Sequence, residues 1–348
     1  MTPLPRDATP SVPATRAVHL ALGGLWLLDG LLQLQPHMFG DAFVTQVLQP
    51  SAQGQAGWIA WLVGTNARFV ALHVAAWTAL FASVQLLIGT GLVLRATVKP
   101  ALALSVVWSL GVWALGEGFG MLLTGTASPL TGAPGAALLY VLVALIAWPR
   151  PPHDAAPAAR VGAGPRHPAG TVAGWRGDGS VASRGLLGAA GARVAWAGLW
   201  VLDGVLWLLP ANTATGAVGR QISAAAAGEP RWLAGILTWA GHQSSSAGAG
   251  TAVVVAALSF AVGLGPLLAR RPTPYLVVGS LLALVFWVLG QAFGGILTGP
   301  LSGTATDPNA GPLVVLVASA LLPGRARTRR TWEPAAPVAE TPVFTLPF

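Results

Sequence analysis

The sequence predicts an all-α integral membrane protein with eight transmembrane helices, arranged as two parallel-related four-helix units. The first reason is composition: of the 348 residues, 54% are hydrophobic and only 9% are charged, whereas soluble domains carry about 25% charged residues. The second reason is a repeated pattern. A Gly-Leu-Trp stretch with one Asp and a closing Pro occupies residues 24–36 and returns at residues 198–210.

One unbroken offset relates the two halves of the chain. Asp29 and Asp203 are 174 positions apart (203 minus 29), and so are Trp113 and Trp287. The same register extends, without a gap, over roughly 130 residues, which is typical of an internal duplication. The predicted organisation is a disordered tail (1–15), a first four-helix unit (16–149), an Ala/Gly/Pro/Arg-rich cytoplasmic linker (150–188), a second four-helix unit (189–323) and a basic, Pro-rich cytoplasmic tail (324–348).

Apolar runs long enough to cross a bilayer set the expected spans. In the first unit we expect them at about 17–36, 69–94, 100–124 and 133–148, and in the second at about 190–210, 247–269, 273–298 and 309–323. The segments 40–62 and 214–241 have helical spacing but are too short to cross, so we expect them at the lipid–water interface. Whether they re-enter the membrane stays open.

The placement of basic residues predicts the orientation. Arg95 and Lys99 separate the second and third spans, Arg270 and Arg271 separate the sixth and seventh, and the linker holds further arginines. Since Lys and Arg gather on the cytoplasmic side, we expect a multi-pass protein of the cell (plasma) membrane with both termini in the cytoplasm.

Ionisable residues within apolar spans are functional candidates by default. Asp29, His73 and Glu117 are expected in one layer near the outer face of the first unit, where they would bind a proton, a cation or a polar ligand. In the second unit Asp203 is kept and Gln291 replaces Glu117, so we assign the chemistry to the first unit. The competing interpretation is that the two Asp residues only fix helix packing.

Glycine-rich segments end the third and seventh predicted spans. They resemble phosphate-binding loops only superficially, because no strand precedes them and no Lys follows. Small residues at this spacing indicate close helix packing, or a helix end that unwinds to expose its backbone, while Asp307 or Asn309 would cap the last helix. The packing and loop candidates are Gly116, Gly118, Phe119, Gly120, Phe293, Gly294, Asp307 and Asn309.

The composition excludes several classes of function. The chain has no Cys, which excludes disulfides and thiolate chemistry. The net charge of +8 comes from arginines beside apolar spans, so no nucleic-acid partner is expected. The expected partners are the lipid bilayer and another membrane protein. No catalytic residue, metal site or cofactor is assigned.

Three functions fit these features. The leading one is a transport-like or ligand-binding membrane protein with an outward-facing polar site. The second is a quinone-linked membrane oxidoreductase subunit, with Trp113 or Phe119 stacking on the ring and Glu117 or His73 passing protons. The third is a structural partner in a membrane complex.

The residues from His19 to Phe39, His-Leu-Ala-Leu-Gly-Gly-Leu-Trp-Leu-Leu-Asp-Gly-Leu-Leu-Gln-Leu-Gln-Pro-His-Met-Phe, resemble the first helix of DoxX-like four-helix membrane proteins. The resemblance implies a tandem duplication of a small integral membrane unit, in some members linked to redox or quinone complexes. Gln33 and Trp207 stand where that family usually has Lys. The high use of Ala, Gly, Arg and Trp also resembles actinobacterial membrane proteins.

Overall fold

The computed structural model describes residues 14–150, 179–298 and 305–323, and within them every regular element is helical. The helices are α1 (Ala14–Gln33), α2 (Gly57–Ala71), α3 (Val74–Val93), α4 (Val98–Leu115), α5 (Ala136–Ile146), α7 (Gly188–Trp207), α8 (Pro210–Thr213), α9 (Ala217–Ala224), α10 (Arg231–Gln243), α11 (Ala249–Leu268), α12 (Thr273–Leu289) and α13 (Ala310–Leu321). Shorter helical turns are η1 (Pro36–Phe39), η2 (Phe43–Leu48), η3 (Gln49–Ala52), η4 (Arg95–Thr97), η5 (Phe119–Met121), η6 (Pro129–Thr131), η7 (Ala182–Arg184) and η8 (Ala292–Gly295).

Residues 1–13 of the first predicted tail, the tail 324–348 and most of the linker 150–188 lie outside the described residues, and residues 14 and 15, predicted in the disordered tail, belong to α1. The first half of the molecule is residues 14–150, and the second half is residues 179–323.

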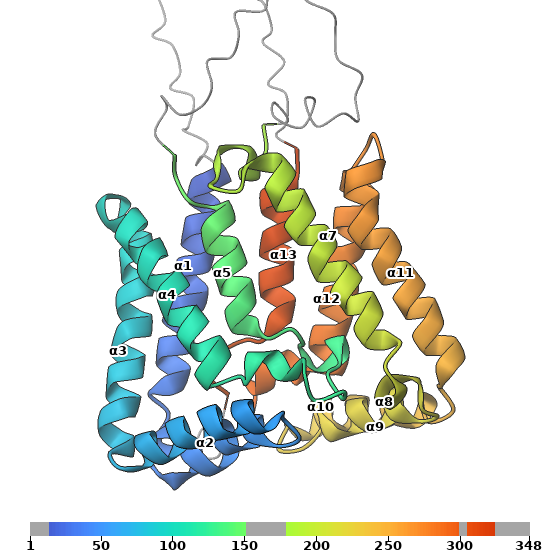
Figure 1. The fold of residues 1–348 in the computed structure, drawn as a ribbon, viewed down its shortest axis with the longest axis horizontal. Coiled ribbons are helices and arrows are strands. Elements are labelled where there is room, and N and C mark those ends of the chain that lie inside the picture. Colours follow the sequence, from blue (N-terminus) through green and yellow to red (C-terminus); the bar gives the residue numbers. More distant parts are fainter. Residues whose placement is uncertain (1–13, 151–178, 299–304, 324–348) are drawn as a thin grey trace, which may run out of the picture.

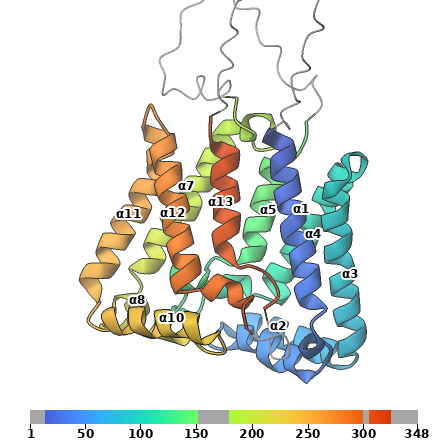
Figure 2. The ribbon, with the colours of Figure 1, turned by 180° about the vertical axis from the view of Figure 1, so that it is seen from behind.

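The helices form two sets that run in different directions. Helices α1, α3, α4, α5, α7, α11, α12 and α13 stand upright, whereas α2, α9 and α10 lie across the lower end of the molecule (Figures 1 and 2). The segments 40–62 and 214–241, predicted at the lipid–water interface, contain the first part of α2, all of α9 and most of α10, and these helices cross the ends of the upright helices.

Four helical stretches are long and apolar enough to cross a membrane: α3, α4 together with η4, α7 and α11. Helices α5, α12 and α13 are apolar but shorter. The twenty residues of α1 include Arg16, His19, Asp29 and Gln33, which lower its hydropathy. A chain with this set of apolar helices has the make-up of a membrane protein.

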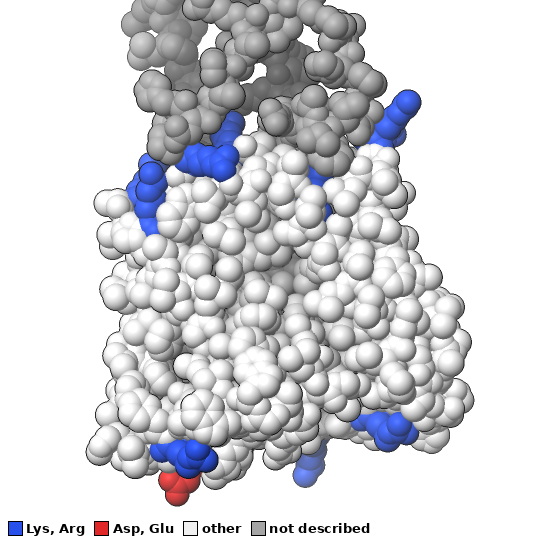
Figure 3. All heavy atoms as spheres, in the orientation of Figure 1, with Lys and Arg blue, Asp and Glu red and all other residues white. Residues whose placement is uncertain are grey.

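Charged side chains are confined to the two ends of the upright helices on the face that Figure 3 shows, and a broad uncharged band separates them. Arg95, Lys99, Arg270 and Arg271 lie in the turns at the upper end, where α3 meets α4 and α11 meets α12. An uncharged belt between charged ends is the surface that a bilayer core requires.

Close helix crossings depend on small residues. Helix α1 packs on α3, and α7 packs on α11. A Cβ atom added at Gly89 of α3 would lie 2.9 Å from the carbonyl oxygen of Gly23 of α1, and one added at Gly263 would lie 3.2 Å from that of Ala197. Both crossings therefore bring backbones together in the way that small residues allow between membrane helices.

The two halves meet along the short helices α5 and α13, which contact each other at the centre of the bundle. Most side chains of both helices are buried. The largest apolar cluster includes Leu139 and Val143 of α5, Leu313 and Val317 of α13, and Trp196 of α7. One core thus spans both halves, because the short helices contribute apolar side chains all around.

The predicted span 69–94 is wrong at its beginning. The chain forms two helices here, α2 and α3, which change direction at Leu72 and His73. His73 has φ −149° and ψ 57°, and its side chain makes no capping hydrogen bond to α3. The continuous apolar character of Phe69 to Val74 hid this corner, because periodicity alone does not mark a change of helix direction.

The predicted spans 100–124 and 273–298 are both too long. Helix α4 ends at Leu115 and α12 ends at Leu289. Beyond these ends the backbone enters left-handed conformations, with φ of 64° at Gly120 and 75° at Gly294. The glycines therefore lie beyond the helices, in segments that unwind at this end and pack closely against their neighbours.

Candidate functional site

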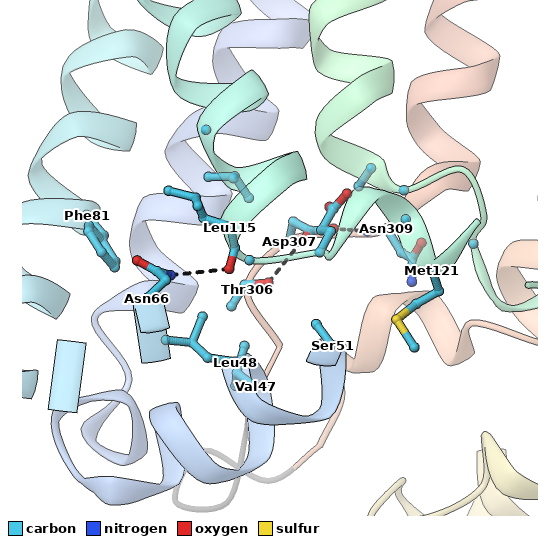
Figure 4. A pocket seen from close by; sticks show the side chains of 18 of the residues that line it. Val47, Leu48, Ser51, Asn66, Phe81, Leu115, Met121, Thr306, Asp307 and Asn309 are labelled. Atoms are coloured by element: carbon cyan, nitrogen blue, oxygen red, sulfur yellow. Dashed lines mark hydrogen bonds between the residues drawn. The ribbon is translucent and has the colours of Figure 1, made fainter. Parts of the chain in front are cut away.

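A cavity of about 820 Å³ lies in the lower part of the first half, between α2, α3, α4 and η2. The connections that precede α5 and α13 also line it, and Figure 4 shows Asp307 and Asn309 above Val47, Leu48 and Ser51. The apolar walls are formed by Phe43, Val47, Leu48, Phe69, Val70, Trp77, Phe81, Leu104, Val107, Trp108, Val112 and Leu115, and the polar side chains include Gln33, Asn66, Gln85, Glu117, Asp307 and Asn309.

The cavity reaches the flank of the bundle. Two of its wall residues, Phe69 and Val107, keep 52% and 70% of their surface exposed. They belong to α2 and α4, on the flank where the chain presents apolar residues outward. The cavity is therefore bordered on this flank by residues that also lie at the surface.

Glu117 lines the cavity and is hydrogen-bonded to the start of α5. It follows the end of α4, and its Oε1 atom accepts a hydrogen bond of 3.0 Å from the backbone nitrogen of Ala137. The carboxylate thus satisfies one of the free N–H groups at the first turn of α5. Gly135 makes this approach possible, because a Cβ atom there would overlap the Glu117 carboxyl group.

The second oxygen of Glu117, Oε2, is buried and has no hydrogen-bond partner. Burial, and next the nearby negative charge of Asp307, raise the pKa of Glu117 to about 8. Its proton is therefore bound and released near neutral pH, which an ordinary surface glutamate does not do.

Asp307 comes from the second half but lines the cavity of the first half. Its Oδ1 atom accepts a 2.6 Å hydrogen bond from the backbone nitrogen of Asn309, and its Oδ2 atom accepts one of 3.0 Å from the hydroxyl of Thr306. Burial raises its pKa as well. Asn309 is the N-cap of α13, with its side-chain oxygen accepting from the Ala310 nitrogen at 2.7 Å.

In each half, the connection that precedes the last helix contacts the other half. The side chain of Gln35 donates a 3.2 Å hydrogen bond to the carbonyl oxygen of Ala305. In the opposite sense, Ser128 donates a 2.7 Å hydrogen bond to the side chain of Gln221. This exchange explains why a second-half carboxylate lies in the first-half cavity.

Three of the remaining sequence candidates lie elsewhere. His73 is exposed at the corner between α2 and α3 and does not line the cavity, so the structure does not bring it to the site beside Glu117. Asp29 is 2% exposed and lies beside Tyr140 of α5, behind the cavity wall. Asp203 accepts a 2.6 Å hydrogen bond from Ser259, which gives it a packing partner in the second half.

Among the described residues, no group of three or more Asp, Glu or His residues lies close enough to hold a metal ion. The expected set of Asp29, His73 and Glu117 therefore does not form a metal site.

Sequence reasoning missed three polar side chains of the cavity. Gln33 Nε2, Gln85 Oε1 and Trp108 Nε1 are buried and have no hydrogen-bond partner. Gln33 and Gln85 are 2% and 8% exposed. Their signal is an amide inside an apolar helix, which is as unusual there as a charge when it has no partner, and a search for ionisable residues alone does not find it.

The second half has the same framework around Gln291. The Oε1 atom of Gln291 accepts a 3.2 Å hydrogen bond from the nitrogen of Ala310, at the start of α13. Trp113 and Trp287 donate to the carbonyl oxygens of Pro134 and Pro308, at 2.9 and 2.6 Å. The residues that correspond to the cavity walls, among them Trp207, Ile222 and Phe286, instead form a packed apolar cluster in the second half.

The aromatic and glycine candidates at these helix ends serve packing. Phe119 lies edge-on to Trp113 with ring centroids 5.1 Å apart, and Phe293 to Trp287 at 4.9 Å. Gly116 follows the last residue of α4, and a Cβ atom at Gly118 would lie 2.5 Å from the carbonyl oxygen of Ser51. A Cβ atom at Gly120 would overlap the carbonyl of Pro134. These residues let the unwound segment lie against its neighbours.

Comparisons of the chain with protein-family models, curated proteins and solved structures give no match. The interpretation of the site consequently rests on its own geometry.

Proposed function

We propose that this chain is a polytopic membrane protein that binds a lipophilic ligand in the cavity beside Glu117. The observation that carries the proposal is the cavity itself: about 820 Å³ with apolar walls, in the range of about 300–1,000 Å³ typical of small-molecule sites. It also contains buried polar atoms without partners, on Gln33, Gln85, Trp108 and Glu117.

Unpartnered polar atoms indicate where the polar end of the ligand would lie. A buried donor or acceptor without a partner costs about 1–3 kcal/mol. A ligand group that hydrogen-bonds to Gln33, Gln85 or Glu117 would remove that cost. The apolar part of the ligand would then lie against Phe81, Trp77 and their neighbours, toward the opening on the flank.

We further propose that the eight upright helices are the spans of two four-helix units produced by duplication. The boundaries support this proposal, because α1 ends at residue 33 and α7 at 207, and α2 begins at 57 and α10 at 231, a difference of 174 in both cases (207 minus 33, 231 minus 57). The short helices α5 and α13 would cross at the centre of the bundle, where most of their side chains are covered by protein.

The orientation follows from the basic residues. We place the protein in the plasma membrane with the upper end of the bundle on the cytoplasmic side. Both termini and the linker are then cytoplasmic, and the cavity opens in the outer half of the bilayer. Because the chain has no Cys, Ala96→Cys and Ser246→Cys place single thiols at the upper and lower ends. A membrane-impermeant maleimide added to intact cells should label Ser246→Cys alone, and labelling of Ala96→Cys alone would reverse the orientation.

Ligand binding is tested by closing the cavity. The full-length protein is purified from its membrane, and the small molecules that it retains are measured by native mass spectrometry for the wild type and for Val112→Phe. Val112 lines the cavity, so the larger ring should expel the ligand. The matched control is Val254→Phe, which changes a side chain that is 68% exposed on α11.

We expect a retained molecule of defined mass in the wild type and in Val254→Phe, and its loss in Val112→Phe. Equal retention by all three proteins would contradict the proposed site.

A further inference from the structure

The charges around the cavity have one sign. Among the described residues that line it are two carboxylates, Glu117 and Asp307, and no Lys, Arg or His. Asp29 and Tyr140 lie behind these carboxylates. The ionisable groups near the two carboxylates are therefore all acidic: Asp29 on α1, which lies near Asp307, and Tyr140 on α5, which lies near Asp29, Asp307 and Glu117. An anionic ligand would have no counter-charge here.

The wall opposite these carboxylates is aromatic. Five rings line the cavity and follow one another in contact. The centroids of Phe69 and Trp77 are 4.9 Å apart, those of Trp77 and Phe81 are 5.9 Å apart, and Phe81 lies 5.4 Å from Trp108 and 6.1 Å from Phe43. The face of an aromatic ring attracts a cation by about 0.5–2 kcal/mol and accepts apolar groups equally well.

Two acceptor atoms without partners complete the site. Oε2 of Glu117 and Oε1 of Gln85 are buried, and both side chains line the cavity. A cationic group with an N–H donor would satisfy either of them, and a cation without one would be held by charge and by the rings. An ionised carboxylate that is buried without a counter-charge is costly, and no cationic side chain among the described residues lines this cavity, so a cationic ligand would supply the missing charge.

We propose that the ligand is a lipophilic organic cation, with its charged centre beside Glu117 and Asp307 and its apolar groups against the rings of Phe43, Phe69, Trp77, Phe81 and Trp108. This inference rests on the proposed ligand-binding function and adds the charge of the ligand. Entry from the bilayer past Phe69 and Val107 suits a cation that partitions into lipid.

Binding of such a cation is linked to a proton. Glu117, with a pKa raised to about 8 by burial and by Asp307, holds its proton at pH 7 in the empty site. A cation beside the carboxyl group favours the ionised form, so the proton leaves to solvent as the cation binds. Affinity should rise with pH up to about 8 and level off above it, by at most about tenfold per pH unit.

The test uses two probes of the same size and shape and of opposite charge, tetraphenylphosphonium and tetraphenylborate. Binding to the purified full-length protein is measured by equilibrium dialysis and by quenching of Trp fluorescence, at pH 6 and pH 8.5. Val112→Phe, with its cavity closed, gives the background from detergent or lipid. We expect the cation to bind about tenfold or more tightly than the anion after this correction.

Two variants test whether the carboxylates cause the preference for the cation over the anion. Glu117→Gln and Asp307→Asn should each reduce the affinity for tetraphenylphosphonium. Glu117→Gln should also reduce the pH dependence and the proton release, leaving only the part that Asp307 contributes. Glu117→Gln should fold, because Gln291 holds the start of α13 through the same type of hydrogen bond in the second half; thermal unfolding of each variant checks this.

The outcomes separate the two proposals. If both probes bind equally well, or if the anion binds more tightly, and Val112→Phe removes this binding, the cavity is a ligand site but the cation inference is wrong. If Val112→Phe changes neither probe's binding nor the retained molecule, the proposed function itself fails.

Discussion

The first and second halves share a framework but fill it differently: the first half encloses a cavity of about 820 Å³, whereas the corresponding side chains of the second half form a packed apolar cluster. At the offset of 174, Gln33 corresponds to Trp207 and Val112 corresponds to Phe286. Trp207 is 2% exposed and its ring centroid lies 5.7 Å from that of Phe286. Two large rings thus occupy, in the second half, the volume that is open in the first.

The carboxylate differs in the same way. Glu117 and Gln291 both hold the first turn of a short central helix through one side-chain oxygen. Only Glu117 adds an ionisable atom without a partner. The helix-capping role therefore belongs to the shared framework, whereas the free carboxyl oxygen, the amides and the volume belong to the first half.

The largest loss of stability is expected from a substitution of Trp207, whose ring fills the second half. Trp207→Ala removes a buried ring and should lower the free energy of unfolding by about 3–5 kcal/mol, because the cavity that it leaves cannot collapse completely. The change is measured by circular dichroism during thermal unfolding in detergent. The control is Gln33→Ala at the corresponding position, where the side chain already borders open volume. Equal losses in Tm for both variants would contradict the asymmetry.

A smaller change is expected in how the stability of the protein depends on pH. Since the pKa of Glu117 in the folded protein is about 8, above its usual value, the folded state binds a proton that the unfolded chain releases. Stability from this group is full below about pH 4.5 and is lost as pH rises toward 8, by up to about 1.4 kcal/mol per pH unit. Glu117→Gln should flatten the Tm of the wild type between pH 5 and 8, which thermal unfolding across pH measures.

Asp307 titrates in the same direction, so the difference between wild type and Glu117→Gln is the quantity to compare. Parallel Tm curves for the two proteins over this range would show that Glu117 is ionised in the fold, and the proposed proton linkage would then be wrong.

The smallest effect is expected at His73. Its side chain is exposed and makes no capping bond, so His73→Ala should change the free energy of unfolding by no more than about 0.5 kcal/mol. Retention of the bound molecule should also be unchanged. A loss of ligand in His73→Ala, measured by native mass spectrometry, would return this residue to the site.

Much of the fold could be predicted because it depends on local composition. The apolar helices, and the surface segments now seen as α2, α9 and α10, follow from hydropathy and spacing. The ends of α4 and α12 were predicted too late, since Phe119 and Met121 are apolar residues that adopt left-handed backbone angles, φ 58° and 59°. Nothing in their side chains marks that conformation.

The site was predictable only in part. Glu117 was identified because a carboxylate in an apolar setting is rare. Asp307 was expected to cap the last helix, and its place in the first-half cavity depends on the exchanged connection near Gln35, a contact between residues far apart in sequence. Gln33 and Gln85 could be identified as site residues only from the structure, because a buried amide becomes a candidate for ligand binding only when no hydrogen-bond partner in the protein reaches it.

An electron-density map of the full-length protein crystallised from native lipid would test the proposed ligand site most directly. We predict continuous density of a bound molecule within the first-half cavity, with its polar end at Glu117, and a second half filled by Trp207 and Phe286. A first-half cavity closed by its own side chains, with Glu117 hydrogen-bonded through both oxygens to the chain, would contradict the central claim.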